Sequence, residues 1–104
     1  MSPEELAELL KSEKPPHLLD VRQPEEHETA VLPNSTLIPL GQLATRAKEI
    51  EAWKNEDVVV YCHHGVRSMM AIGGLRMMGF KKLHNLTGGI DSWSLKVDAS
   101  VPRY

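Results

Sequence analysis

The sequence predicts an α/β fold with a mainly parallel central sheet and helices on both faces of the sheet. Short apolar runs alternate along the chain with segments of helical periodicity, and the connections between them are short, which is typical of strands joined by helical crossovers. The clearest strand is residues 58–61, because a run of β-branched residues suits a strand buried on both faces. A length of 104 residues and an apolar content of 41% suit one domain over residues 1–104.

The boundaries of the other elements follow from capping and breaking residues. Ser2, Pro3 and Glu5 have the types and spacing of a helix start with a capping box. Two prolines after Lys14 end this helix, because the residue before a proline disfavours helical backbone angles. We expect further strands at residues 18–21, 36–38 and 83–86, helices at residues 24–28, 43–53 and 68–78, Gly79 as the residue that ends the last of these, and a short final helix holding Trp93.

The loop after the strand at residues 58–61 contains the only cysteine, Cys62, and reads Cys-His-His-Gly-Val-Arg-Ser. A cysteine between a strand end and a helix N-terminus meets backbone N–H groups and the helix dipole, which lower a thiol pKa. Gly65 allows a positive φ that turns loop N–H groups inward as an anion nest, Arg67 offers a guanidinium fork to an oxyanion, and Ser68 is expected to cap the next helix. We therefore expect Cys62 to be an activated nucleophile and its anion-binding cradle to comprise His63, His64, Gly65, Val66, Arg67 and Ser68.

The pattern Cys-x-x-Gly-x-Arg-Ser after an apolar strand resembles the active-site loop of single-domain rhodaneses, which are sulfurtransferases. Residues 18–22 are similar to the family's strand that ends in Asp-Val-Arg, and residues 88–93 are similar to its Gly-Gly-x-x-x-Trp motif. Residues 26–39 keep the length of the family's intervening stretch, so the resemblance covers nearly the whole chain. The departures are Ala30, Val31, Asn34, Ser35 and Leu37, where the family has Gly, His, Gly, Ala and Asn.

This resemblance implies a rhodanese domain that moves a sulfane sulfur through a persulfide on Cys62. The donor would be a small anion such as thiosulfate, and the acceptor would be cyanide in an assay and a thiol or a sulfur-carrier protein in a cell. A protein that donates a persulfide is an equal candidate partner. Residues 26–40 and 101–104 look similar to rhodanese domains fused to sulfur-carrier-activating enzymes. We expect no cofactor.

Two other functions compete with sulfur transfer. The first is a rhodanese-like binding module without turnover, but such modules have usually lost the cysteine, whereas Cys62, Gly65 and Arg67 are all present. The second is a cysteine phosphatase or an arsenate reductase. Those loops place five residues between cysteine and arginine, and four lie between them here. A shorter loop makes a cramped nest for a phosphate, which has three non-bridging oxygens.

Several other side chains are expected near the loop. Asp20 and Arg22 follow a neighbouring strand and should form the pocket wall, since ligands bind beyond the carboxyl ends of parallel strands. They would act either as an ion pair that braces the wall or through contact with substrate. His63 and His64 would be either exposed loop side chains or cations that attract anionic donors. With Cys62 they make three consecutive ligands, which do not converge easily on one ion, so we expect no metal.

The helix after the loop carries four methionines and a pair of glycines. We expect the methionines to fill the core, with an apolar docking patch near the loop as the alternative. Gly73 and Gly74 should let the helix pack closely on the sheet. The methionines are Met69, Met70, Met77 and Met78.

Composition limits the function classes and the compartment. A net charge of −2 provides no basic surface for nucleic acid, and no stretch approaches the roughly 18 apolar residues of a membrane span. The acidic N-terminus lacks the features of a signal peptide, so a cytoplasmic protein is expected. A single cysteine excludes both an internal disulfide and a resolving cysteine, so sulfur on Cys62 must leave to an outside partner.

Overall fold

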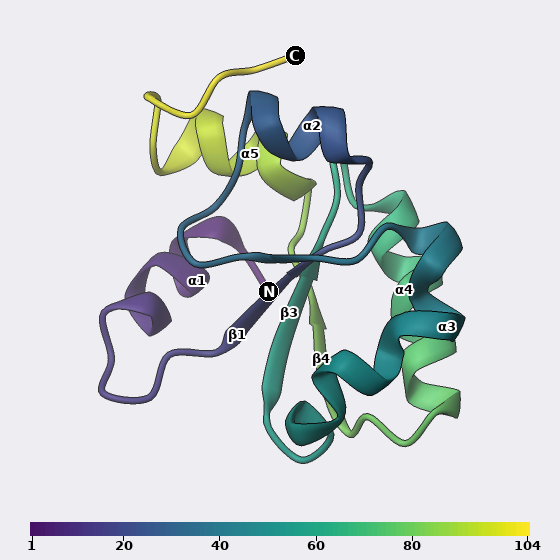
Figure 1. The fold of residues 1–104 in the computed structure, drawn as a ribbon. Helices are drawn as coiled ribbons and strands as arrows, with labels where there is room; N and C mark the ends of the chain where they lie inside the picture. Colours follow the sequence, from purple (N-terminus) through teal and green to yellow (C-terminus); the bar gives the residue numbers. More distant parts are fainter.

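A computed structural model describes residues 1–104 as a parallel sheet with helices on both sides (Figure 1). The sheet has four strands in the order β2-β1-β3-β4, and each neighbouring pair is parallel. Strand β3 lies between β1 and β4, which places its carboxyl end in the middle of one sheet edge. The strands are β1 (His17–Asp20), β2 (Thr36–Leu37), β3 (Asp57–Tyr61) and β4 (Lys82–Asn85).

Helices cover both faces of this sheet. Helices α1 and α5 lie on one side and α3 and α4 on the other, while α2 lies at the upper end beside the C-terminal tail (Figure 1). None of the helices combines the length and the apolar character that crossing a membrane requires. The helices are α1 (Pro3–Leu10), α2 (Pro24–Thr29), α3 (Leu43–Arg46), α4 (Val66–Met77) and α5 (Gly89–Lys96), with 3₁₀ helices η1 (Leu40–Gln42) and η2 (Ala47–Trp53).

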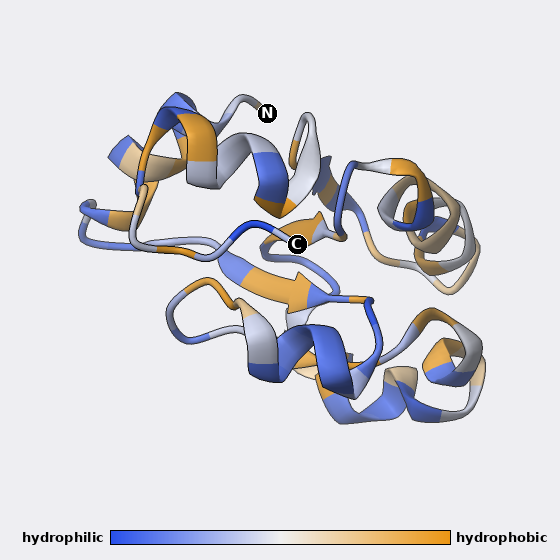
Figure 2. Cartoon of the chain, turned by 90° about the horizontal axis from the view of Figure 1, so that it is seen from above, coloured by the Kyte–Doolittle hydropathy of each residue, from blue (hydrophilic) through white to orange (hydrophobic).

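The core consists of two apolar clusters separated by the sheet. Because successive strand side chains point to opposite faces, Val58 and Val60 join Leu75 of α4 in one cluster. Val59 of the same strand joins Trp93 of α5 in the other. Figure 2 shows hydrophobic strands at the centre, between helices that carry both hydrophobic and hydrophilic residues. The predicted α/β fold with helices on both faces is therefore confirmed.

The segment 43–53 differs from the single helix that its periodicity predicts. It divides into the short helix α3 and the 3₁₀ helix η2, with non-helical angles at Ile50. A 3₁₀ helix brings residues i and i+3 onto the same side. Ala47 and Ile50 are both buried, and Trp53, three residues further, packs partly against the core cluster that contains Ile50. Packing on the sheet thus accounts for the tighter helix.

Helix α4 begins two residues earlier than expected, and Ser68 is not its cap. Gly65 is the N-cap residue and has a φ of +109°, which L side chains rarely adopt. Ser68 lies inside the first turn, where its hydroxyl oxygen is 3.0 Å from the carbonyl oxygen of Gly65. At the other end, Gly79 has a positive φ and follows the helix as predicted.

The prediction that the methionines of α4 fill the core is wrong. Met69 and Met70 are each 64% exposed, and Met77 is 91% exposed. Only Met78 packs partly against the core. The buried face of α4 consists of small and branched residues instead: Ser68, Ala71, Ile72 and Leu75.

The prediction that a glycine pair brings α4 close to the sheet is also wrong. A Cβ atom built at Gly73 or Gly74 would meet nothing within 4 Å. Gly73 lies on the exposed side of the helix. The small residue that does face the sheet is Ala71.

Candidate active site

Cys62 lies directly after β3, at the carboxyl edge of the sheet, and is 1% exposed. Its Sγ accepts a hydrogen bond from the N–H group of Gly65 at 3.0 Å and one from the N–H group of Ser68 at 3.4 Å. The hydroxyl oxygen of Ser68 lies 3.4 Å from the same sulfur. The turn into α4 therefore surrounds the sulfur with donors.

Two opposing effects act on the pKa of the Cys62 thiol. Burial is the largest and raises the pKa, because it disfavours the charged thiolate. Hydrogen bonds from the Ser68 hydroxyl and from the N–H groups of Ser68, Gly65 and His64 together outweigh burial, so the pKa is lowered from its ordinary value. A position at the N-terminus of α4 favours negative charge in the same sense.

The start of α5 fixes the other side of the loop. The carbonyl oxygen of Cys62 accepts from the N–H group of Ile90 at 2.9 Å, and that of His63 accepts from the N–H group of Asp91 at 3.1 Å. Gly89 has a φ of +65°, and a Cβ atom there would collide with the carbonyl groups of Cys62 and His63. The Gly-Gly motif therefore permits the close approach of α5 that holds the cysteine loop.

Arg67 is paired with a carboxylate. Its Nη1 and Nη2 donate to Glu26 Oε1 and Oε2 at 2.7 and 2.9 Å. The hydrogen bonds from Arg67 are the main reason why the pKa of Glu26 is lowered to about 2, against the effect of burial. An anion that bound to these two donors would have to displace Glu26, so the predicted oxyanion fork is occupied by α2.

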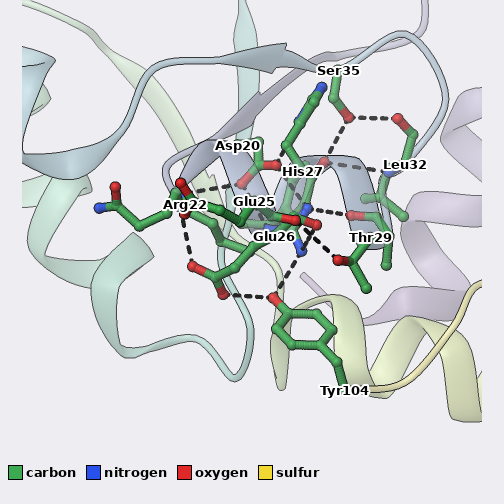
Figure 3. Close-up of polar contacts among 12 residues, drawn as sticks. Asp20, Arg22, Glu25, Glu26, His27, Thr29, Leu32, Ser35 and Tyr104 are labelled. Carbon is green, nitrogen blue, oxygen red and sulfur yellow. Dashed lines mark hydrogen bonds and ion pairs between the residues drawn. The ribbon is translucent and has the colours of Figure 1, made fainter.

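Asp20 and Arg22 form a completely buried ion pair (Figure 3). Arg22 Nε and Nη2 donate to the two carboxylate oxygens of Asp20 at 2.9 and 2.8 Å. Its other hydrogen bonds go to the carbonyl oxygens of Glu26 and Ala30 and to the hydroxyl of Tyr104. With its donors directed at these protein groups, Arg22 has the geometry of a brace rather than of a substrate ligand.

The C-terminal tail lies over the site. Seen from above in Figure 2, the chain end reaches the middle of the molecule, over the ends of the strands. The Tyr104 hydroxyl accepts from Arg22 Nη1 at 2.8 Å and donates to Glu26 Oε2 at 2.7 Å. Its ring stacks on His63 with centroids 3.9 Å apart. The sequence predicted no role for Tyr104. Its hydroxyl nevertheless contacts both Arg22 and Glu26, and so links the Asp20–Arg22 pair to the Glu26–Arg67 pair.

The two loop histidines differ in environment. The His63 ring lies against Tyr104 on one face and against His64 on the other. Burial, followed by the nearby His64, lowers the pKa of His63, so a neutral ring is favoured at neutral pH. His64 and Val66 are exposed. A charged His63 that attracts anions is therefore not supported by this geometry.

His63, His64 and Asp91 are the three side chains near the loop whose ligand atoms lie within 4.8 Å of one another. The centroids of the two histidine rings lie 3.9 Å apart, and the rings are tilted by 31° to one another. The Asp91 carboxylate accepts from Arg103 Nε at 2.9 Å. These contacts favour a polar cluster over a metal centre.

Three residues of the site were not singled out by the sequence pattern. Glu26 and Tyr104 contact Arg67 and Arg22 across long sequence separations, which no local motif reveals. Asn85 reaches Ser68 from the end of β4, with Oδ1 2.5 Å from Ser68 Oγ. Only the parallel pairing of β4 with β3 could have predicted that contact, because it places Asn85 beside Val60 at the same sheet edge.

A parallel α/β sheet with a cysteine loop at the carboxyl end of its central strand is the arrangement that the resemblance to single-domain rhodaneses implies. The family model for the rhodanese-like domain matches residues 2–96. The chain therefore belongs to the rhodanese-like domain family.

Relatives and solved structures agree with this membership. A sulfurtransferase of Allochromatium vinosum is 34% identical, and the match covers 88% of this chain and 83% of that protein. A chloroplastic rhodanese-like/PpiC domain-containing protein of Arabidopsis thaliana is 46% identical over 84% of this chain. The crystal structure of a rhodanese-like domain protein from Staphylococcus aureus has a TM-score of 0.85 and 29% identity, covering 100% of this chain and 96% of that one.

The length of these relatives varies widely. The chain spans only 30% of the Arabidopsis protein, against 83% of the Allochromatium sulfurtransferase. The same kind of domain thus occurs both as most of a protein and as one part of a longer one.

Proposed function

We propose that this chain is a sulfurtransferase that carries a sulfane sulfur as a persulfide on Cys62. The observation that carries the proposal is the set of donors around Cys62 Sγ at the N-terminus of α4. They favour the thiolate, which is the form of cysteine that acts as a nucleophile. Membership of a family with sulfurtransferase relatives supports the same chemistry.

The reaction proceeds in two displacements at sulfur. The Cys62 thiolate attacks the outer sulfur of thiosulfate, the S–S bond of the donor breaks, and sulfite leaves with the bonding electron pair. Cyanide then attacks the outer sulfur of the Cys62 persulfide, and thiocyanate leaves while the thiolate is restored. Each step begins and ends with an anion at the same loop, where preorganised N–H donors stabilise it.

No proton has to move in either displacement, because Cys62 enters the reaction as a thiolate. The site accordingly needs no general base. The carboxylates nearest the loop are engaged elsewhere, Glu26 by Arg67 and Asp91 by Arg103. Their role in the proposal is to hold the loop and the tail in place.

An exposed apolar stripe on α4 suits a protein that delivers or receives the sulfur. Met69 and Met70 lie three and four residues after Val66, and Met77 lies seven residues after Met70. All four are at least 64% exposed. Such spacing places them along one face of a helix. The stripe begins beside the loop, so a protein that brings a persulfide or a carrier thiol to Cys62 would cover it.

The stripe gives a test of the partner class. Replacing Met69 and Met70 together by glutamine should slow sulfur transfer from a cysteine desulfurase persulfide at least about threefold, because contact with apolar side chains is lost. Transfer from thiosulfate should not change. Leu95→Gln is the matched control, since Leu95 is 59% exposed on α5. Equal rates for the double variant and the control would contradict docking on this stripe.

Thiocyanate release tests the proposed activity. Incubation with thiosulfate and cyanide should yield thiocyanate with the native chain and none with Cys62→Ser, whose hydroxyl cannot form a persulfide. The variant should unfold at about the same temperature, since serine is close to cysteine in size. Undiminished thiocyanate release by Cys62→Ser would contradict the proposal, and no release by either chain from any donor would favour the alternative of a binding module.

A further inference from the structure

Ser68 is completely buried beside Cys62, and its hydroxyl group faces three acceptors. Ser68 Oγ lies 3.0 Å from the carbonyl oxygen of Gly65, 2.5 Å from Asn85 Oδ1 and 3.4 Å from Cys62 Sγ. A hydroxyl carries one proton, so Ser68 donates to one acceptor at a time. The direction of this proton decides whether Ser68 stabilises the sulfur.

The protonation state of Cys62 changes what Ser68 must do. A thiol donates its own proton to Ser68 Oγ, and the Ser68 hydroxyl then donates to Asn85 Oδ1. A thiolate has no proton to give and accepts one from Ser68 instead. Ser68 Oγ and Asn85 Oδ1 would then face each other as two acceptors only 2.5 Å apart, which is unfavourable.

The amide of Asn85 removes this conflict, because it has an acceptor at one end and donors at the other. Turning the amide over exchanges Oδ1 and Nδ2, so Nδ2 donates to Ser68 Oγ while Ser68 donates to Cys62 Sγ. We propose that Asn85 is a positioning residue that directs the Ser68 hydroxyl to Cys62 when the thiol ionises. This inference rests on Cys62 being the nucleophile of the proposed function.

The backbone around Asn85 is held in place, which leaves the amide as the part that turns. Asn85 ends β4 and lies opposite Val60 in the parallel register with β3. The next N–H group, of Leu86, donates to the carbonyl oxygen of Val60 at 3.1 Å. The amide is thus presented to Ser68 from the same strand pair that carries Cys62.

Asn85→Asp is the informative change, because a carboxylate has the shape of the amide but only acceptors. The carboxylate of this variant should accept the hydrogen bond from the Ser68 hydroxyl at all times. The Cys62 thiolate then loses Ser68 Oγ as a donor. The rate of Cys62 alkylation by iodoacetamide is measured across pH. The midpoint of this pH dependence should move to higher pH, and below the midpoint the rate should be about tenfold lower than in the native chain. Asn85→Ala leaves Ser68 free to donate to Cys62 and should shift the midpoint less.

The added negative charge also disfavours the thiolate, and a second background separates the two effects. In Ser68→Ala the charge effect of Asn85→Asp persists, but no hydroxyl can be directed, so the shift should be clearly smaller than in the native background. Equal shifts in both backgrounds, or a larger shift for Asn85→Ala than for Asn85→Asp, would overturn the inference. Circular dichroism checks that each variant is folded.

Alkylation needs no sulfur donor, so it tests the role of Asn85 separately from the proposed sulfur transfer. A chain whose alkylation follows the expected pattern but which accepts no sulfur from any donor would contradict the sulfurtransferase and leave the role of Asn85 intact. A chain that transfers sulfur, but in which Asn85→Asp shifts the alkylation midpoint equally in the native and Ser68→Ala backgrounds, would support the sulfurtransferase and overturn the role of Asn85.

Discussion

At the scale of single residues, the Cys62 sulfur is both buried and surrounded by donors. Burial keeps water away and strengthens each remaining electrostatic interaction. The N–H groups of Gly65 and Ser68 are fixed by the backbone, so they need no rearrangement when charge develops on the sulfur. A substitution that moves the loop backbone should therefore weaken the stabilisation of the Cys62 thiolate more than one that only replaces a neighbouring side chain.

Gly89 provides a prediction at this scale. Gly89→Ala should destabilise the chain by about 1–3 kcal/mol or more, because a positive φ disfavours an L side chain and the new Cβ atom collides with the loop carbonyls. Sulfur transfer should fall with it, since the loop must shift. Urea denaturation and thiocyanate release measure the two effects.

The matched control is Gly73→Ala in α4. No atom lies within 4 Å of a Cβ at Gly73, and alanine is the better helix former. This variant should be more stable than the native chain by up to about 1 kcal/mol, with unchanged transfer. Similar stabilities for Gly89→Ala and Gly73→Ala would contradict the reason given for the Gly-Gly motif.

At the scale of elements, α2 and α4 are joined by the ion pair between Glu26 and Arg67. The pKa of Glu26 is lowered to about 2, from an ordinary 4.5 that applies in the unfolded chain. A carboxyl whose folded pKa is depressed contributes stability that is present above the unfolded pKa and is lost as pH falls through the folded pKa. The window for this loss runs from about pH 4.5 down to about 2.

Glu26→Gln should therefore be less stable than the native chain at neutral pH and should lose less stability on acidification. The free energy of unfolding, measured by urea denaturation between pH 7 and pH 2.5, should show the two chains converging as the pH falls. Glu25→Gln is the control, because Glu25 is exposed in the same helix. Parallel curves for Glu26→Gln and the native chain would mean that the pair with Arg67 contributes little.

The elements also show how far the sequence predicts this structure. All four strands were predicted: the β-branched run indicated β3, and prolines flank the segments predicted as β1 and β2. A capping box predicted α1, and these signals are local. The tighter helix η2 and the exposed methionines depend on which side of a helix meets the sheet, and periodicity alone does not specify that. The loop position of Cys62 was predictable from its neighbours, whereas Glu26, Asn85 and Tyr104 reach the site only through the tertiary fold.

At the scale of the whole molecule, Arg22 connects β1, α2 and the C-terminal tail. Its guanidinium binds Asp20 and Tyr104 and lies over the rings of Tyr61 and Tyr104, with distances to the ring centroids of 5.4 and 5.7 Å. Both members of the ion pair are completely buried, so removing one leaves an uncompensated charge.

Arg22→Met should accordingly destabilise the whole chain by about 3–5 kcal/mol, because the Asp20 carboxylate remains buried without its partner. Arg46→Met is the matched control. Arg46 pairs with Glu49 near the surface, and losing that pair should cost less than about 1 kcal/mol. Urea denaturation of both variants measures the difference, and equal losses of stability would mean that Arg22 is not the central brace.

The central claim is that Cys62 carries the transferred sulfur, and intact mass spectrometry tests it most directly. After incubation with thiosulfate, the chain should gain the mass of one sulfur atom, cyanide should remove that mass, and Cys62→Ser should gain nothing. If thiosulfate does not load the chain, a cysteine desulfurase is the second donor, and a gain from it alone would identify a protein persulfide as the source. The absence of a mass gain from either donor, or the same mass gain in Cys62→Ser as in the native chain, would contradict the claim that Cys62 carries the sulfur.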